Sequence, residues 1–226
     1  MHIEVGQAPS GRGWVVIYLG QALRKFDTSD DLLAYLEWFA LTQAVGAMPG
    51  AVALHGAALS NGESCMLLLG ASGAGKTTLT LGLMARGWRP LTDDIVLIDP
   101  NTLAIAPFPR CFHVDEAAKS LVAQQANLEW PGKLSGYARP TTWATGGQSA
   151  TTLVVVQRCP TCMAARFPIL QAEAAGGLLA EAAGTQLSAS VVASVAARLA
   201  AGAKCYRLKN GPLESSLNLI EKACKR

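Results

Sequence analysis

The chain has 226 residues and a formal net charge of +3; half of its residues are hydrophobic and 15% are charged. This composition suits a compact α/β protein whose central strands are covered on both faces, and the mild charge gives no argument for nucleic-acid binding. No apolar run reaches the roughly 18 residues that span a bilayer, and the first residues lack a signal-peptide pattern. The sequence therefore predicts a cytoplasmic protein with no nucleic-acid or membrane partner, whose six cysteines are reduced thiols.

Residues 1–50 predict a small N-terminal part. Two short apolar runs within the first 20 residues are typical of a strand hairpin. Thr28 then offers an N-cap for a helix with one apolar face, which ends near Gly46. We expect a single domain over 1–226, made of this hairpin and helix and of a core at 51–226.

A buried strand, a glycine-rich loop and a helix follow one another between Met66 and Leu79. The glycine-rich loop, Gly70–Thr77, has the spacing G-x-x-x-x-G-K-T of the Walker A phosphate loop, in the strand–loop–helix context that this motif requires. Lys76 would neutralise charge on the β- and γ-phosphates, and the Thr77 hydroxyl would ligate Mg²⁺. Backbone N–H groups and the helix N-terminus would add to the phosphate site. We therefore predict a nucleoside triphosphate site made of Ser72, Gly73, Ala74, Gly75, Lys76, Thr77 and Thr78.

Two strand-like runs flank Asn61-Gly62, a strong hairpin signal. If these two residues form the turn, His55 lies opposite Leu68, two residues before the glycine-rich loop. This register predicts that His55 lies at the mouth of the nucleotide site. The alternative is a core histidine with satisfied hydrogen bonds.

A short strand at 88–92 ends on the adjacent acids Asp93 and Asp94. In a parallel sheet the carboxyl ends of the strands form the ligand-binding edge, so we expect this pair beside the glycine-rich loop. Two carboxylates are needed where Mg²⁺ is held and a hydroxyl proton is accepted. A pair of turn aspartates is the alternative.

Cys159 and Cys162 are predicted to be two thiols in a turn, because zinc would need further ligands at matching spacing and a thioredoxin-type pair should open a helix. The segment 163–168 after them reads as a loop. The rest of the chain predicts a hairpin around Pro100-Asn101, an irregular segment that carries Arg110 toward the site, a helix at 114–125, a mobile loop at 130–148, a strand at 151–157, a helix at 188–201, a strand at 205–208 and a helix at 213–224.

Over residues 51–99 the sequence resembles the catalytic domain of the HPr serine kinase/phosphorylase family. The resemblance rests on His55-Gly56, the Asn-Gly hairpin, the glycine-rich loop and the run Arg-Gly-Trp-Arg-Pro-Leu-Thr-Asp-Asp at 86–94. It implies an α/β P-loop NTPase of the HPr kinase or phosphoenolpyruvate-carboxykinase-like type, with a mixed central sheet and flanking helices. Short members of this type occur as tailoring kinases that phosphorylate a serine of a peptide precursor, including lasso peptides, and the chain is similar to those as well.

The resemblance implies an ATP- and Mg²⁺-dependent kinase that phosphorylates a serine-bearing small protein or precursor peptide. Carried over to this sequence, the catalytic residues are His55, Lys76, Asp93 and Asp94, and the metal ligands are Thr77 and Asp94. Which aspartate acts as the base is left open, and so is assembly into homo-oligomers. A regulatory NTPase without a protein acceptor and a small-molecule kinase are the alternative functions.

Overall fold

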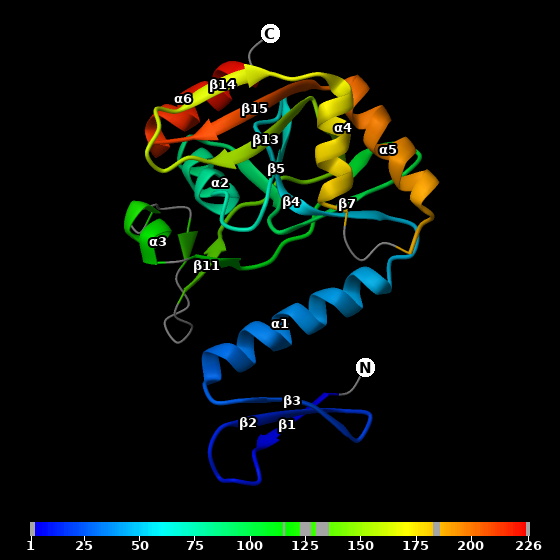
Figure 1. The fold of residues 1–226 in the computed structure, drawn as a ribbon, viewed down its shortest axis with the longest axis vertical. Helices are drawn as coiled ribbons and strands as arrows, with labels where there is room; N and C mark the ends of the chain where they lie inside the picture. The colour runs from blue at the N-terminus through cyan, green and yellow to red at the C-terminus, as the bar shows by residue number, and fades with distance from the viewer. Residues whose placement is uncertain (1–2, 115, 123–127, 130–135, 183–185, 225–226) are drawn as a thin grey trace. The chain divides into compact units, whose positions relative to one another are not determined.

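The computed structural model describes residues 3–114, 116–122, 128–129, 136–182 and 186–224 (Figure 1). The chain divides into two compact units, residues 1–47 and 48–226. This division lies close to the boundary expected between the N-terminal part and the core. That the two units make up a single domain stays a prediction.

The smaller unit is a three-stranded antiparallel sheet followed by a helix. Its elements are β1 (Ile3–Gln7), β2 (Trp14–Tyr18), β3 (Gln21–Phe26) and α1 (Ser29–Gly46). The Thr28 side chain accepts a hydrogen bond from the backbone N–H of Asp31, which caps the start of α1. The hairpin and the helix are as the sequence predicts, whereas β3 is an additional strand.

The larger unit contains a mixed nine-stranded sheet in the part of the chain that the structure describes. Its elements are β4 (Val52–Ser60), β5 (Cys65–Leu69), α2 (Lys76–Ala85), β6 (Arg89–Thr92), β7 (Ile95–Ile98), β8 (Ala104–Ala106), β9 (Phe112–His113), α3 (Glu116–Val122), β10 (Leu128–Glu129), β11 (Tyr137–Pro140), β12 (Gln148–Ser149), β13 (Thr152–Arg158), β14 (Ala165–Pro168), α4 (Gln171–Ala180), α5 (Ala189–Gly202), β15 (Lys204–Asn210) and α6 (Leu213–Cys224). The strand order is β12-β8-β7-β4-β5-β13-β15-β14, and β6 pairs with β4. Among the described strands, β13 alone pairs in parallel, with β5 and β15.

Helices cover both faces of this sheet (Figure 1). In β5, Cys65, Leu67 and Leu69 face a core shared with α4 and α5, while Met66 and Leu68 face a core shared with α2 and α6. Successive side chains of a strand point to opposite faces, so a strand buried on both sides reads as one continuous apolar run. The mixed α/β fold with flanking helices therefore agrees with the sequence.

Strand direction brings the glycine-rich loop and the acid pair to one edge of the sheet. Both β5 and β6 run antiparallel to β4. They consequently point the same way, although β6 is not a neighbour of β5. The loop that follows β5 and the acids that follow β6 therefore emerge at the same edge, as the sequence predicts. The prediction assumed a parallel sheet, whereas here the two strands have the same direction because each pairs with β4.

The register expected for the β4–β5 hairpin is wrong. Gly56 pairs with Leu69 and Ser60 with Cys65, because the turn spans four residues instead of two. The Asn61 side-chain oxygen accepts hydrogen bonds from the backbone N–H groups of Glu63 and Ser64, which stabilises the wider turn. His55 therefore lies next to the point where β5 passes into the loop, nearer to it than expected.

Two further segments are more regular than the sequence predicts. Strand β14 lies where a loop is expected at 163–168, and it is held by antiparallel pairing with β15. Helix α4 follows in a segment for which the sequence made no prediction. Within the expected mobile loop, β11 pairs with β9 and β12 pairs with β8. Residues 130–135 of that loop, and 123–125 of the expected helix at 114–125, lie outside the described residues.

The remaining expected elements are present within a few residues of their predicted bounds, including the hairpin around Pro100-Asn101 and α6. Within the described ranges, no helix combines the length and the apolar character that crossing a membrane requires.

Leu67 tests the two-sided burial of β5. Its side chain is fully buried, so Leu67→Ala should lower the free energy of unfolding by about 2–5 kcal/mol through lost transfer energy and a cavity. The matched control is Leu170→Ala, because the Leu170 side chain is 77% exposed and its truncation should change stability little. Urea unfolding of both variants measures the difference. Equal unfolding midpoints would contradict the burial of β5.

Candidate active site

Glycines shape the loop between β5 and α2. Gly70 and Gly75 have φ angles of 140° and 97°, a region that L side chains rarely adopt. A Cβ at Gly70 would lie 2.4 Å from the Val156 carbonyl oxygen, and one at Gly75 would lie 2.4 Å from Nδ2 of Asn210. That same amide nitrogen donates to the Ala74 carbonyl oxygen at 3.0 Å. The loop therefore requires glycine at both positions, for its conformation and for close packing.

Lys76 lies almost buried at the start of α2, with 5% of its surface exposed. Its Nζ donates hydrogen bonds to the backbone carbonyl oxygens of Gly70 and Ala71. Burial lowers the pKa of Lys76, while the negative charges of Glu181, Asp94 and Asp93 oppose that shift. The ammonium is thus held within the loop and faced by three carboxylates.

Thr77 and Asp93 are joined by a hydrogen bond from Oγ1 to Oδ2 of 2.9 Å. Asp93 is 1% exposed, and its Oδ1 is buried with no hydrogen-bond partner among the described residues. Burial raises the pKa of Asp93 to about 7, helped by the charge of Asp94 and opposed by the Thr77 hydrogen bond. A buried polar atom of this kind is rare in native proteins and needs an explanation.

Asp94 lies at a sharp bend of the chain between β6 and β7. Its φ is 65°, and the N–H of Ile95 donates to the Asp93 carbonyl oxygen at 2.9 Å. This bend lets two adjacent acids serve one site. The Asp94 side chain is 38% exposed and forms an ion pair of 3.3 Å with Nη1 of Arg110, which reaches the site from the irregular segment, as expected.

His55 is held by Glu181, a residue that the sequence does not indicate. Its Nδ1 lies 3.0 Å from Oε2 of Glu181, and its backbone N–H donates to the Glu181 carbonyl oxygen at 2.7 Å. The two side chains are 35% and 15% exposed. His55 is therefore not a core histidine: its ring is fixed from one side and lies open on the other.

A cavity of about 650 Å³ joins most of the predicted site residues. It is lined by His55, Ser72, Gly73, Ala74, Gly75, Lys76, Thr77, Thr78 and Asp94, together with residues such as His113, Arg158 and Asn210. Asp93 does not line this cavity and reaches it through Thr77. Arg158 follows the predicted strand at 151–157, so its place at the ligand edge could have been read from that strand's end. Asn210 ends β15 in register with Arg158 and could have been read in the same way, whereas Glu181 and His113 have no comparable local signal.

The donor set beside Thr77 fits a hard divalent cation. Mg²⁺ prefers oxygen ligands and keeps several of its waters, and the Thr77 hydroxyl with the buried Asp93 carboxylate supplies two oxygens at the loop. The sequence predicts Thr77 and Asp94 as the metal ligands. In the structure, the acid that bonds Thr77 is Asp93, whose Oδ1 has no partner among the described residues. Within the described ranges, no group of three or more His, Cys, Asp or Glu side chains gathers as a metal cluster.

The prediction of two free thiols at Cys159 and Cys162 is wrong, because the structure joins them in a disulfide. Their Cα atoms are 5.5 Å apart, which is within the usual range for a bridge. The turn between them is closed by the N–H of Cys162, which donates to the Cys159 carbonyl oxygen.

Comparisons with known proteins give one distant similarity to report. No protein-family model matches the sequence, and no curated protein matches it. Among the matching solved structures is the Hpr(Ser) kinase/phosphatase from Coxiella burnetii. The identity is 11%, over 76% of this chain and 92% of that chain, with a TM-score of 0.35. The chain thus has only a distant structural relationship to that protein.

The raised pKa of Asp93 predicts how stability depends on pH. The pKa of the Asp93 carboxyl is about 4 in the unfolded chain and about 7 in the folded protein. The folded state therefore binds the proton more tightly in this window, and stability falls as pH rises from about 4 to 7. Asp93→Asn cannot ionise and should show a shallower fall. Urea unfolding at intervals of pH, with chelator present, measures both profiles; identical slopes would contradict the shift.

Proposed function

We propose that the chain is an ATP- and Mg²⁺-dependent P-loop kinase that transfers a γ-phosphoryl group to the serine hydroxyl of a peptide or small protein. The observation that carries the proposal is the pair of carboxylates beside the glycine-rich loop. Asp93 is buried against the Thr77 hydroxyl, and Asp94 faces the loop cavity. Phosphoryl transfer to a hydroxyl needs two such groups, one for the metal and one for the acceptor. The sequence resemblance to HPr serine kinases supports the serine hydroxyl as acceptor.

The loop and Lys76 would bind the triphosphate. Backbone N–H groups of the loop and the N-terminus of α2 favour anions. The Lys76 ammonium would exchange its present carbonyl partners for β- and γ-phosphate oxygens. Thr77 and Asp93 would hold Mg²⁺, which, when bound, neutralises charge on those oxygens.

Asp94 is the better placed of the two acids to serve the acceptor. It lines the cavity and is partly exposed, whereas Asp93 is buried and bonded to Thr77. Asp94 would orient the serine hydroxyl and accept its proton while the serine oxygen forms a bond to the γ-phosphorus. The bond from that phosphorus to the bridging oxygen breaks, and ADP leaves with that oxygen. Arg110 would hold the Asp94 side chain during this step.

His55, on the strand paired with the segment that follows Asp94, would contribute from the same cavity. Its Nδ1 is engaged by Glu181, which leaves Nε2 as the ring nitrogen available to the cavity. An imidazole fixed in this way would hydrogen-bond a phosphate oxygen during transfer. Glu181 would act as a positioning residue through His55.

The direct test supplies the protein with Mg²⁺, ³²P-labelled ATP and a library of short peptides that differ in the residues around one serine. The expected product is phosphoserine peptide, detected by mass spectrometry. The matched control library replaces serine by alanine. Release of inorganic phosphate without labelling of either library would favour a regulatory NTPase. Transfer of the label to a small molecule in a metabolite extract would favour a small-molecule kinase.

Lys76→Ala should lower transfer at least a hundredfold, because no other lysine of the described residues lines the larger cavity. The hydrogen bonds that Lys76 donates to described residues go to carbonyl oxygens of its own loop, so the fold should survive, as circular dichroism can verify. Phosphopeptide formation and calorimetry with Mg·ATP measure the effect. Wild-type rates in this variant would overturn the nucleotide assignment.

Asp93→Asn and Asp94→Asn should both abolish transfer but differ in nucleotide binding. Asp93→Asn should lose the Mg²⁺-dependent part of ATP affinity, because it removes a carboxylate from beside Thr77. Asp94→Asn should still bind Mg·ATP within about twofold of wild type, because the acceptor side alone has changed. Calorimetry with and without Mg²⁺ separates the two. The reverse pattern would mean that Asp94 holds the metal and Asp93 serves the acceptor. Full activity in both variants would mean that the two acids are ordinary turn residues with no part in transfer.

A further inference from the structure

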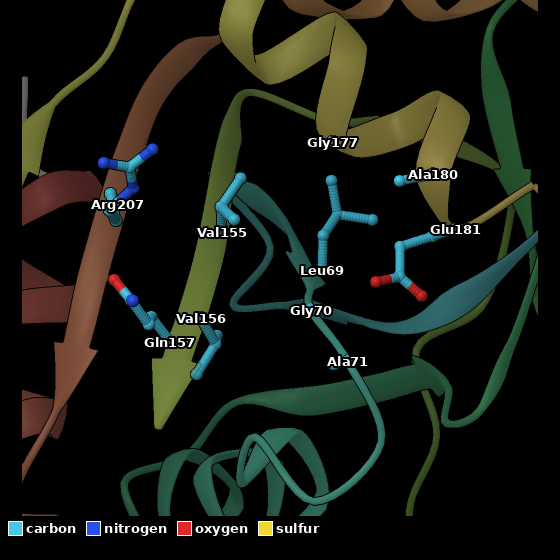
Figure 2. Close-up of a pocket in the computed structure, with 10 residues that line it drawn as sticks. All are labelled: Leu69, Gly70, Ala71, Val155, Val156, Gln157, Gly177, Ala180, Glu181 and Arg207. Atoms are coloured by element: carbon cyan, nitrogen blue, oxygen red, sulfur yellow. The ribbon is translucent and has the colours of Figure 1, made fainter. Parts of the chain in front are cut away.

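A second cavity, of about 420 Å³, lies between α4 and the sheet (Figure 2). Its floor comes from three neighbouring strands, because Val155 of β13 pairs with Leu69 of β5 and with Arg207 of β15. Residues paired in register share one face of a sheet. Its other wall is α4, where Gly177 and Ala180 are too small to fill the space. The volume falls within the range of about 300–1,000 Å³ that is usual for ligand pockets.

This second cavity lies at the start of the glycine-rich loop, whereas the proposed nucleotide site lies along the rest of the loop. It is lined by Gly70 and Ala71, the first two residues of the loop, whereas Ser72–Thr78 line the larger cavity. Glu181 belongs to its wall and bonds His55, which belongs to the larger cavity. Figure 2 shows the Glu181 carboxylate above the start of the loop. The two cavities are therefore divided by the loop and by the Glu181–His55 pair.

The chemistry of the walls favours a neutral polar ligand. The side chains of Leu69 and Val155 supply apolar surface. Gln157 supplies an amide that can both donate and accept. Oε2 of Glu181 is engaged by His55, and no described residue bonds Oε1, which can accept from a hydroxyl or a peptide N–H.

The two charged side chains of this cavity each already have a partner. Arg207 is paired with Glu173, and Glu181 is paired with His55. A strongly anionic ligand, such as a second phosphate, would face the Glu181 carboxylate. An uncharged peptide segment offers the matching donors, acceptors and small apolar groups.

We propose that this second cavity is the acceptor site, and that it takes the serine residue of a peptide together with its neighbouring backbone. The inference rests on the proposed kinase function and adds where the acceptor binds. A serine seated there would extend its hydroxyl past Ala71 into the larger cavity, toward the γ-phosphoryl group and Asp94, with Glu181 accepting a hydrogen bond from the peptide. The nucleotide occupies the larger cavity, and the rest of the acceptor peptide stays in the second one.

Ala180→Leu tests the site by filling it. Ala180 lies exposed at the end of α4, so a larger side chain there should not disturb folding. The matched control is Ala172→Leu, on the same helix, exposed and away from the cavity. The acceptor probe is the serine peptide that the wild-type protein phosphorylates fastest in the library.

The expected result is a KM for that peptide at least tenfold higher in Ala180→Leu, with the Kd for Mg·ATP within twofold of wild type and Ala172→Leu unchanged in both. An unchanged peptide KM overturns the acceptor site while leaving the kinase function standing. A Kd for Mg·ATP weakened tenfold means that the nucleotide base occupies this cavity, which also overturns it.

Gln157→Leu, on the sheet side of the cavity, provides a second variant if Ala180→Leu fails to fold, and it should raise the peptide KM in the same way. A wild-type protein that phosphorylates no peptide overturns the proposed function and the acceptor site together. That result is distinct from a kinase whose peptide KM does not respond to either substitution.

Discussion

The candidate site depends on one buried carboxylate at the edge of the sheet. Asp93 follows β6, lies 1% exposed and is held by the Thr77 hydroxyl. An unpaired buried charge is costly, so burial raises the pKa of Asp93. Positive groups nearby are needed to stabilise its ionised form. Lys76 and Arg110 provide part of that compensation. The remaining unpartnered Oδ1 is the feature that a divalent cation would satisfy.

The sheet converts distant parts of the sequence into neighbours at this edge. The loop and the acids follow two strands that both run against β4, and β13 brings Arg158 to the same edge beside the loop. Apolar contacts on both faces of β5 fix this frame. Because β5 is buried on two sides, a one-residue shift in its register would move every one of its side chains into the other core. The position of the loop is therefore set by packing rather than by the loop itself.

Local signals in the sequence were sufficient for the loop, the helix after it, the acid pair and the closing helix. Each depends on spacing, caps and apolar runs within about ten residues. The β4–β5 register was missed because the Asn61 side chain builds a wider turn than Asn-Gly usually forms. Strand β14 and Glu181 were missed because pairing with β15 and contact with His55 join segments far apart in the chain. Such contacts leave no periodic trace in a single sequence.

The balance of charge around the loop explains why a metal is part of the proposed chemistry. Lys76, Arg110 and Arg158 bring three positive charges to the site, and Asp93, Asp94 and Glu181 bring three carboxyl groups. A site so balanced has little net attraction for a triphosphate, and Lys76 is already faced by carboxylates on both sides of the loop. A divalent cation beside Thr77 would reverse that balance on the Asp93 side. Glu181 would remain on the other side, where its Oε2 bonds the His55 ring. The proposed nucleotide site would thus become cationic only when the metal arrives with ATP, while the acceptor side would keep the neutral character that suits a peptide.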